Sequence, residues 1–254
     1  MATKIHTYSA LEQVASADLN NIQANIIPAD DFAGIMKGAW RIYSRSGTSI
    51  VIEDPIVIQP GNGNEVTYTG GTLTYSPGTL SNSTWYYLYA VDNGTLTHSS
   101  TGPTDLWGTT ARYLCSFYSD STGAILPFFK QQGLVRYRTS SVSASKFLLV
   151  SSGVGAGGTG YNDLTNILIP PHTRLGIYYC TIIATTSGAV GVSLRLRTKD
   201  DTSNYQELIP QVKDIINNRE ITLEHKSTTQ QIQWSKQNTD NDITIECHGY
   251  YDSW

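Results

Sequence analysis

The chain has 254 residues, a formal net charge of −4 and 15% charged residues, below the roughly 25% typical of soluble globular proteins. Its Lys and Arg residues form no extended cluster, so we expect no general electrostatic hold on nucleic acid. No apolar run approaches the roughly 20 residues of a membrane helix, and the first residues lack a signal-peptide pattern, so we expect neither membrane insertion nor secretion.

Residues 1–36 predict a short amphipathic helix. Ser16 can cap its start, and the apolar side chains of Leu19, Ile22 and Ile26 fall on one face. Pro28 ends the pattern. An isolated helix of this length is marginal in water, so we expect it to dock on the rest of the chain or on a partner.

From Trp40 onward the apolar residues alternate with a period of two, which predicts short strands. The strand pattern "WYYLYAV" runs into Asn93-Gly94, a typical hairpin turn. A second hairpin is predicted for "RYLCSFYSDSTGAILPFF", with "SDSTG" as its turn. The polar stretch at 130–133 marks a boundary. We therefore predict a mainly β protein with a helical segment (1–36), a central antiparallel β domain (37–133) and a C-terminal jelly-roll or β-sandwich (134–254).

A G-x-G-x-x-G pattern at Gly153, Gly155 and Gly158 follows an apolar, strand-like run. A dinucleotide site needs such glycines between a strand and a helix, because the helix N-terminus holds the pyrophosphate. Here Pro170-Pro171 arrives before a helix could mature, and the chain has no alternating β-α-β pattern. We interpret the segment as a flexible connection between strands.

Residues that carry catalytic or metal chemistry are scattered. The chain has three cysteines, each inside an apolar run, which indicates buried free thiols, and its five histidines have no metal-ligand spacing. Neither a G-x-S-x-G nor an H-E-x-x-H motif is present. We expect no catalytic set, no cofactor and no metal, although carboxylate pairs for glycoside hydrolysis meet only in space and stay open.

Aromatic side chains crowd two places. In a two-faced strand, half of them must be exposed or lie in an interface. One interpretation is core and subunit contact, and the sharper one is a platform for stacking sugar rings, since Tyr and Trp suit both kinds of interface. The candidate glycan or subunit contacts are Trp85, Tyr87, Tyr89, Tyr250, Tyr251 and Trp254.

Three stretches resemble virion proteins of tailed bacteriophages. "SADLNNIQ" is similar to a helix near their N-terminus, and "HGYYDSW" to the endings of fibre knobs. "WYYLYAVDNGTLTHSSTGP" with "RYLCSFYSDSTGAILPF" resembles a module of tail-fibre and head-fibre proteins, with Cys115 where those proteins carry Gly. The resemblance implies a virion structural protein, typically a homotrimer, made in the host cytoplasm. It also implies anchoring to other virion proteins through Leu19, Ile22 and Ile26.

The sequence is compatible with three functions. The first is an oligomeric fibre, spike or capsid-decoration subunit whose C-terminal β domain faces outward, with host-surface polysaccharide as a candidate ligand. The second is a phage polysaccharide depolymerase, and the third a stand-alone carbohydrate-binding module. Depolymerases usually build a long groove from repeats, and this chain has no internal repeat. The fibre hypothesis is therefore favoured.

Overall fold

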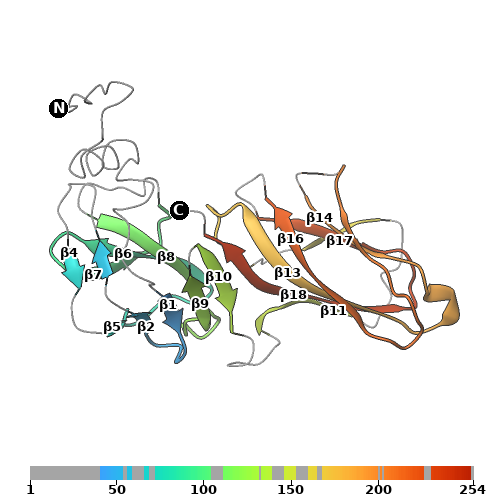
Figure 1. The fold of residues 1–254 in the computed structure, drawn as a ribbon, viewed down its shortest axis with the longest axis horizontal. Helices are drawn as coiled ribbons and strands as arrows, with labels where there is room; N and C mark the ends of the chain where they lie inside the picture. The colour runs from blue at the N-terminus through green and yellow to red at the C-terminus, as the bar shows by residue number, and fades with distance from the viewer. Residues whose placement is uncertain are drawn as a thin grey trace, which may run out of the picture.

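The computed structural model describes residues 41–53, 56–58, 66–68, 72–103, 111–131, 133–138, 146–152, 160–164, 168–199, 201, 203–225 and 230–252. These residues form two β lobes that lie end to end along the longest axis of the molecule (Figure 1). The predicted mainly β class is confirmed. The predicted N-terminal helix, with Leu19, Ile22 and Ile26, lies outside the described residues. Within them no helix is long and apolar enough to cross a membrane.

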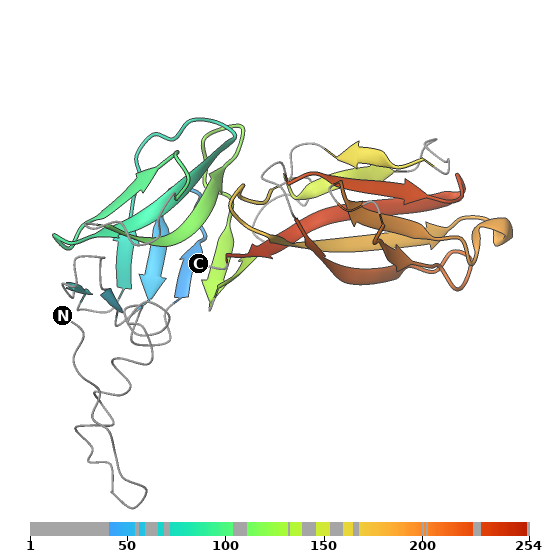
Figure 2. The ribbon, with the colours of Figure 1, turned by 90° about the horizontal axis from the view of Figure 1, so that it is seen from above.

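The first lobe carries two main layers (Figure 2). One layer is the sheet β7-β6-β8, and the other is formed by β5, β2, β1, β9 and β10, while β3 and β4 make a separate hairpin. The strands are β1 (Arg41–Ser44), β2 (Ile50–Glu53), β3 (Ile56–Ile58), β4 (Val66–Tyr68), β5 (Thr72–Tyr75), β6 (Thr84–Val91), β7 (Leu96–Ser99), β8 (Ala111–Ser119), β9 (Phe128–Gln131) and β10 (Leu134–Tyr137).

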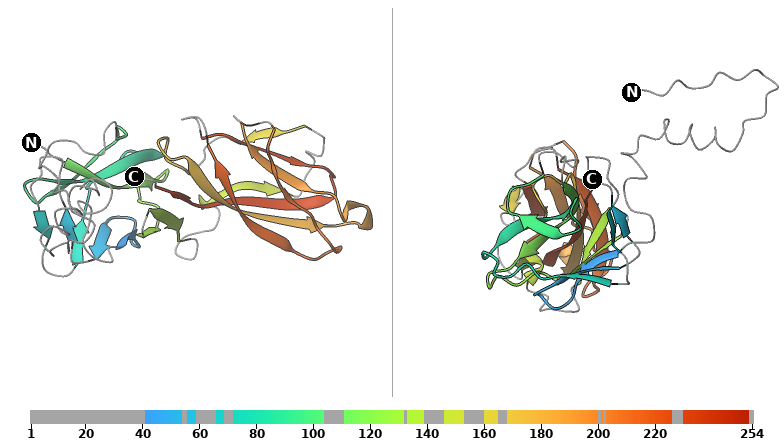
Figure 3. Two further views of the ribbon diagram at one scale, coloured as in Figure 1. Left: turned by 45° about the horizontal axis from the view of Figure 1, so that its top comes forward. Right: turned by 90° about the vertical axis from the view of Figure 1, so that its left-hand side faces the viewer.

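The second lobe is sandwich-like. One sheet contains β16, β13, β18 and β11, and the other has the order β12-β17-β14-β15 (Figure 3). Alternate side chains of both sheets, such as Ile182, Ile245 and Leu196, enter the common core. The elements are β11 (Leu148–Ser152), β12 (Asn162–Leu164), β13 (Leu175–Ala184), the 3-10 turn η3 (Ser187–Ala189), β14 (Leu194–Thr198), β15 (Gln206–Leu208), β16 (Asn217–Glu224), β17 (Ile232–Lys236) and β18 (Asn241–Tyr251).

One sheet runs through both lobes, in the order β16-β13-β18-β10-β9-β1-β2-β5. Cross-strand partners share a face of a sheet, so their register defines a row of side chains. The row passes through Ile52, Ile42, Lys130, Val135 and Tyr250, all fully buried. The boundary predicted at residue 133 falls in the turn between β9 and β10, and this sheet continues across it.

Both predicted turns form, but the strand β9 that follows the second turn belongs to another sheet than β8. Asn93-Gly94 joins β6 to β7, and Gly94 adopts a positive φ of 83°. After β8, the Asp120 carboxylate accepts hydrogen bonds from Thr122 and Ala124, which shapes the "SDSTG" turn. The predicted second hairpin forms next to its turn, where Ser119 pairs with Ile125 and the Leu126 N–H donates to the Tyr118 carbonyl. It is wrong from β9 onward, because β9 pairs with β1 and β10 while β8 pairs with β6. The chain crosses from one layer to the other here.

A bulge near the end of β18 reverses its alternation. Ile243, Ile245 and Cys247 are buried, as period-two alternation requires, but the pairing with β13 then skips one residue, so Tyr250 is buried and Tyr251 exposed. Gly249 lies at this bulge with a φ of 152°, and an added Cβ would lie 2.0 Å from the carbonyl oxygen of β10. The close approach lets β18 pair with β10 and so join the two lobes.

We predict that Gly249→Ala destabilises the protein by roughly 2–4 kcal/mol, because the added methyl group forces β18 away from β10. Chemical denaturation followed by fluorescence measures this loss. Gly188→Ala is the matched control, since no atom lies within 4 Å of its added Cβ. Equal stability of the two variants would contradict the predicted role of the close approach.

Candidate functional site

The second lobe covers the aromatic face of β6. Trp85 lies edge-on to Tyr250 with ring centroids 5.8 Å apart, and Tyr87 lies edge-on to His172 at 5.3 Å. Tyr250 and Tyr87 are only 1% and 3% exposed. Burial raises the pKa of Tyr87 to about 12, with smaller contributions from the neighbouring Tyr89 and from a nearby carboxylate. These aromatic residues therefore close the interface between the lobes of one chain.

The remaining predicted contacts differ in exposure. Tyr89 is partly buried and lies edge-on to Tyr113, with centroids 5.9 Å apart. Tyr251 is 38% exposed, so its side chain is accessible in the single chain. Trp254 lies outside the described residues. A role in glycan or subunit contact stays a prediction for these positions.

A cluster of polar side chains lies beneath this aromatic face, and we call it the interlobe cluster. Lys130 donates a 2.6 Å hydrogen bond to Asp252, and Tyr113 donates to the same carboxylate at 2.8 Å. The His172 ring nitrogen Nε2 lies 3.1 Å from Asp252, and Ser116 contacts Tyr113 at 2.6 Å. Lys130 also donates to a backbone carbonyl oxygen of β8 at 2.7 Å.

The centre of the interlobe cluster is a buried ion pair between Lys130 and Asp252. The side chains of Lys130 and Asp252 are 1% and 0% exposed. Burial alone would raise the pKa of Asp252, but the Lys130 ammonium and the hydrogen bond from His172 outweigh burial and lower it. Burial, followed by the Asp252 charge, holds the pKa of Tyr113 well above its ordinary value. Asp252 is therefore ionised and Tyr113 is a neutral donor at neutral pH.

Ser116, His172 and Asp252 have the composition of a catalytic triad but not its geometry. In a triad the Asp binds one imidazole nitrogen and the Ser binds the other. Here Asp252 and Ser116 both approach Nε2, at 3.1 and 3.5 Å. An ionised carboxylate only accepts, so this nitrogen carries a proton and cannot act as a base toward Ser116. The cluster fits a structural lock between the lobes.

Other predicted chemical features have simple structural explanations. Cys115, Cys180 and Cys247 are buried free thiols, as predicted, and burial raises their pKa to about 12. The described part of the chain contains no group of His, Cys, Asp and Glu suited to a metal ion. The glycines of the G-x-G-x-x-G pattern lie outside it. The segment that holds them connects β11 with β12, and no helix begins at the residues that follow it.

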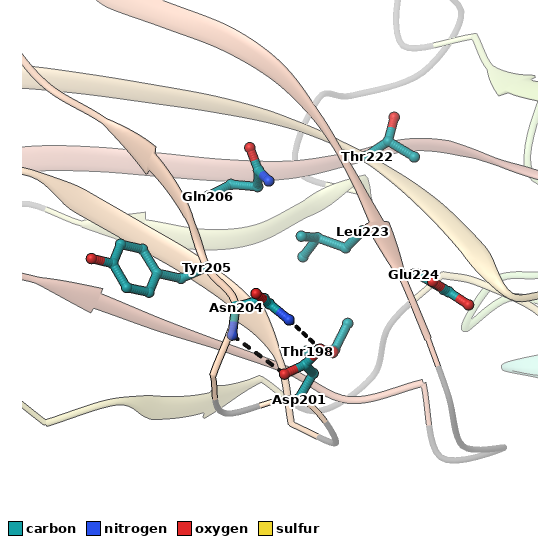
Figure 4. A pocket seen from close by; sticks show the side chains of 8 residues that line it. All are labelled: Thr198, Asp201, Asn204, Tyr205, Gln206, Thr222, Leu223 and Glu224. Carbon is teal, nitrogen blue, oxygen red and sulfur yellow. Dashed lines mark hydrogen bonds between the residues drawn. The ribbon is translucent and has the colours of Figure 1, made fainter.

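A polar groove of about 300 Å³ lies where the edge strands of the two second-lobe sheets approach each other. This volume is at the lower end for small-molecule sites. In Figure 4, Leu223 points from β16 toward the β14–β15 hairpin, whereas the Tyr205 ring points away from β16. The lining residues are Thr198, Asp201, Asn204, Tyr205, Gln206, Thr222, Leu223 and Glu224.

The sequence patterns do not identify the interlobe cluster. Lys130 belongs to the polar stretch interpreted as a domain boundary, and Asp252 follows the aromatic pair near the C-terminus. These two residues are 122 positions apart. One local signal in the sequence is that Lys130 directly follows an apolar run. A lysine that is buried within an apolar strand almost always has a partner.

We predict that Lys130→Met destabilises the protein by about 3–5 kcal/mol, because it leaves the Asp252 carboxylate buried without its cation. Denaturant titration measures the change. Lys199→Met is the matched control: its ion pair with Asp163 is 43% exposed on both sides, so water screens it and the loss is small. Comparable losses in the two variants would refute the lock.

Comparisons with known proteins yield weak structural similarity only. No protein-family model matches the sequence, and no curated protein matches it. Among solved structures, "Major Tropism Determinant I1 Variant" is 23% identical over 36% of this chain and 28% of its own length, with a TM-score of 0.29. A structure described as "carbohydrate-binding modules from the beta-sandwich super family" is 16% identical over 84% and 93%, with a TM-score of 0.21. A structure of infectious bursal virus derived T=1 particles is 15% identical over 85% of this chain and 67% of its own length, with a TM-score of 0.20.

Proposed function

We propose that this protein is a bacteriophage virion structural protein, a subunit of a fibre, a spike or a capsid decoration. The N-terminal segment attaches it to the particle, and the second lobe faces outward. The observation that carries the proposal is the lock between the lobes. A shared sheet and the buried Lys130–Asp252 pair make one elongated body, as a projecting particle component requires. The resemblance of residues 16–23, 85–103 and 112–128 to phage virion proteins supports it.

An exposed apolar segment supports assembly with other copies. Of the six large apolar or aromatic side chains that are exposed in the described residues, four lie between 209 and 216. They include Val212, Ile215 and Ile216, each more than half exposed. Such a patch on a low-charge protein suits an interface. We propose that a second copy of the chain covers it in a homotrimer.

The alternatives differ in what the second lobe does alone. A stand-alone carbohydrate-binding module would be a monomer without particle attachment. A polysaccharide depolymerase would need paired carboxylates around a substrate. The groove contains Asp201 and Glu224, but both oxygens of Asp201 accept hydrogen bonds from Ser203 and Asn204, which stabilise the hairpin. A binding role for the second lobe is therefore preferred over hydrolysis.

We predict that deleting residues 1–36 from the protein in the phage abolishes its incorporation into particles, because the anchor is lost while both β lobes remain. Mass spectrometry of purified particles measures incorporation, and circular dichroism of the purified truncated chain checks that its β structure persists. Particles that still contain the truncated chain would refute the anchor. A full-length chain absent from particles would refute the proposed function.

We predict that the purified chain sediments as a trimer and that the double substitution Ile215→Asp and Ile216→Asp yields monomers, because burying two carboxylates is costly. Thr97→Asp is the control, since it adds a charge at an exposed position of the first lobe. Sedimentation velocity distinguishes the species. A wild-type monomer, or a trimer unaffected by the double substitution, would contradict this interface.

A further inference from the structure

The outer face of the sheet β12-β17-β14-β15 carries a regular array of polar groups. Leu194, Leu196 and Trp234 point inward, so the residues between them point outward. Arg195 and Arg197 project from β14, where Glu207 and Gln233 are their cross-strand partners. Asp163 lies opposite Gln233 on β12. We call this surface the arginine face, and it comprises Tyr161, Asp163, Arg195, Arg197, Lys199, Tyr205, Glu207 and Gln233.

Two tyrosines flank the arginine face at its opposite edges. Tyr161 precedes the edge strand β12, and its ring lies 3.5 Å from the guanidinium carbon of Arg197. Tyr205 precedes the other edge strand, β15, and its ring centroid lies 4.7 Å from the guanidinium carbon of Arg195. Three strand spacings separate these edges, which is about 14 Å. Each ring is thus held by a guanidinium group, and Tyr205 remains 44% exposed.

Hydrogen bonds hold the groups between the tyrosines in place. Arg195 donates from Nε to Glu207 at 2.7 Å, and Arg197 donates from Nε to Gln233 at 3.0 Å. Gln233 donates in turn to Asp163 at 2.7 Å. The array therefore presents planar amide, carboxylate and guanidinium groups in fixed positions. Such groups form paired hydrogen bonds with neighbouring hydroxyls, and aromatic rings pack against the apolar faces of sugar rings.

We propose that the arginine face binds a saccharide chain laid across the strands, with Tyr161 and Tyr205 as stacking platforms. This inference rests on the proposed function, because it assigns the outward-facing lobe a ligand on the host surface. The face carries Arg195, Arg197 and Lys199 against Asp163 and Glu207, so the charges nearly balance. The two carboxylates would repel the phosphates of a nucleic acid, which favours a saccharide over single-stranded DNA.

The polar groove extends the arginine face beyond Tyr205. Tyr205 is one of the residues that line the groove, and its ring points away from β16 (Figure 4). The same ring packs against the guanidinium group of Arg195. Gln206 and Asn204 line the groove from the hairpin, and Thr222 lines it from β16. Amide and hydroxyl groups of this kind can bind the hydroxyls of a sugar unit adjacent to the one stacked on Tyr205.

The test measures binding of the full-length chain to an array of microbial oligosaccharides and to an oligothymidylate as the nucleic-acid probe. We expect at least one oligosaccharide to bind and the oligothymidylate not to bind. Tyr205→Ala and Tyr161→Ala should each weaken saccharide binding about tenfold, through loss of a stacking surface. Tyr205→Phe keeps the ring and should bind like the wild type.

Tyr179→Ala is the matched control. Tyr179 lies on the sheet of β13 and stacks on His248 with centroids 4.9 Å apart, so it resembles the two platforms but belongs to another surface. Unchanged binding in Tyr161→Ala and Tyr205→Ala, an equal loss in Tyr179→Ala, binding of the oligothymidylate alone, or no saccharide binding would each overturn the inference. Incorporation into particles is measured separately, so the proposed function stands or fails on that result.

Discussion

The buried ion pair between Lys130 and Asp252 is the constraint on which the structure depends. Lys130 belongs to the first lobe, and Asp252 follows the last strand of the second. Either charge alone in this environment would cost several kcal/mol, so each lobe holds a group that is stable only when the other lobe is present. Tyr113 and His172 complete the hydrogen bonding of the carboxylate. The two lobes therefore form one cooperative unit rather than domains on a linker.

Contact between the two lobes covers one face of β6 and leaves other surfaces accessible. Tyr86 and Leu88 enter the common core, while Trp85 and Tyr87, on the other face of β6, contact the second lobe. Trp85, Tyr87 and Tyr250, three of the aromatic residues singled out in the sequence, thus hold the two lobes together. Exposed apolar and polar-aromatic surfaces remain on the second lobe, in the segment 209–216 and on the arginine face.

Local patterns predicted the local structure well. Alternation predicted the strands, Asn93-Gly94 predicted a hairpin, and apolar surroundings predicted that the cysteines are buried. Alternation assumes an unbroken register, so it could not show the bulge that turns Tyr250 inward. A strand pattern also does not identify which distant strand lies opposite. The pairing of β9 with β1, and the residues that gather around Asp252, therefore required the fold.

The separation of Lys130 and Asp252 has a consequence for biosynthesis. At about 5–20 residues per second, a ribosome needs roughly 6–24 s to make the 122 positions between them. Throughout that interval the nascent first lobe carries an ammonium group without its carboxylate and an open sheet edge at β10. Such an edge is prone to pairing with neighbouring chains. Chaperone protection during translation would then matter more for this protein than its modest size suggests.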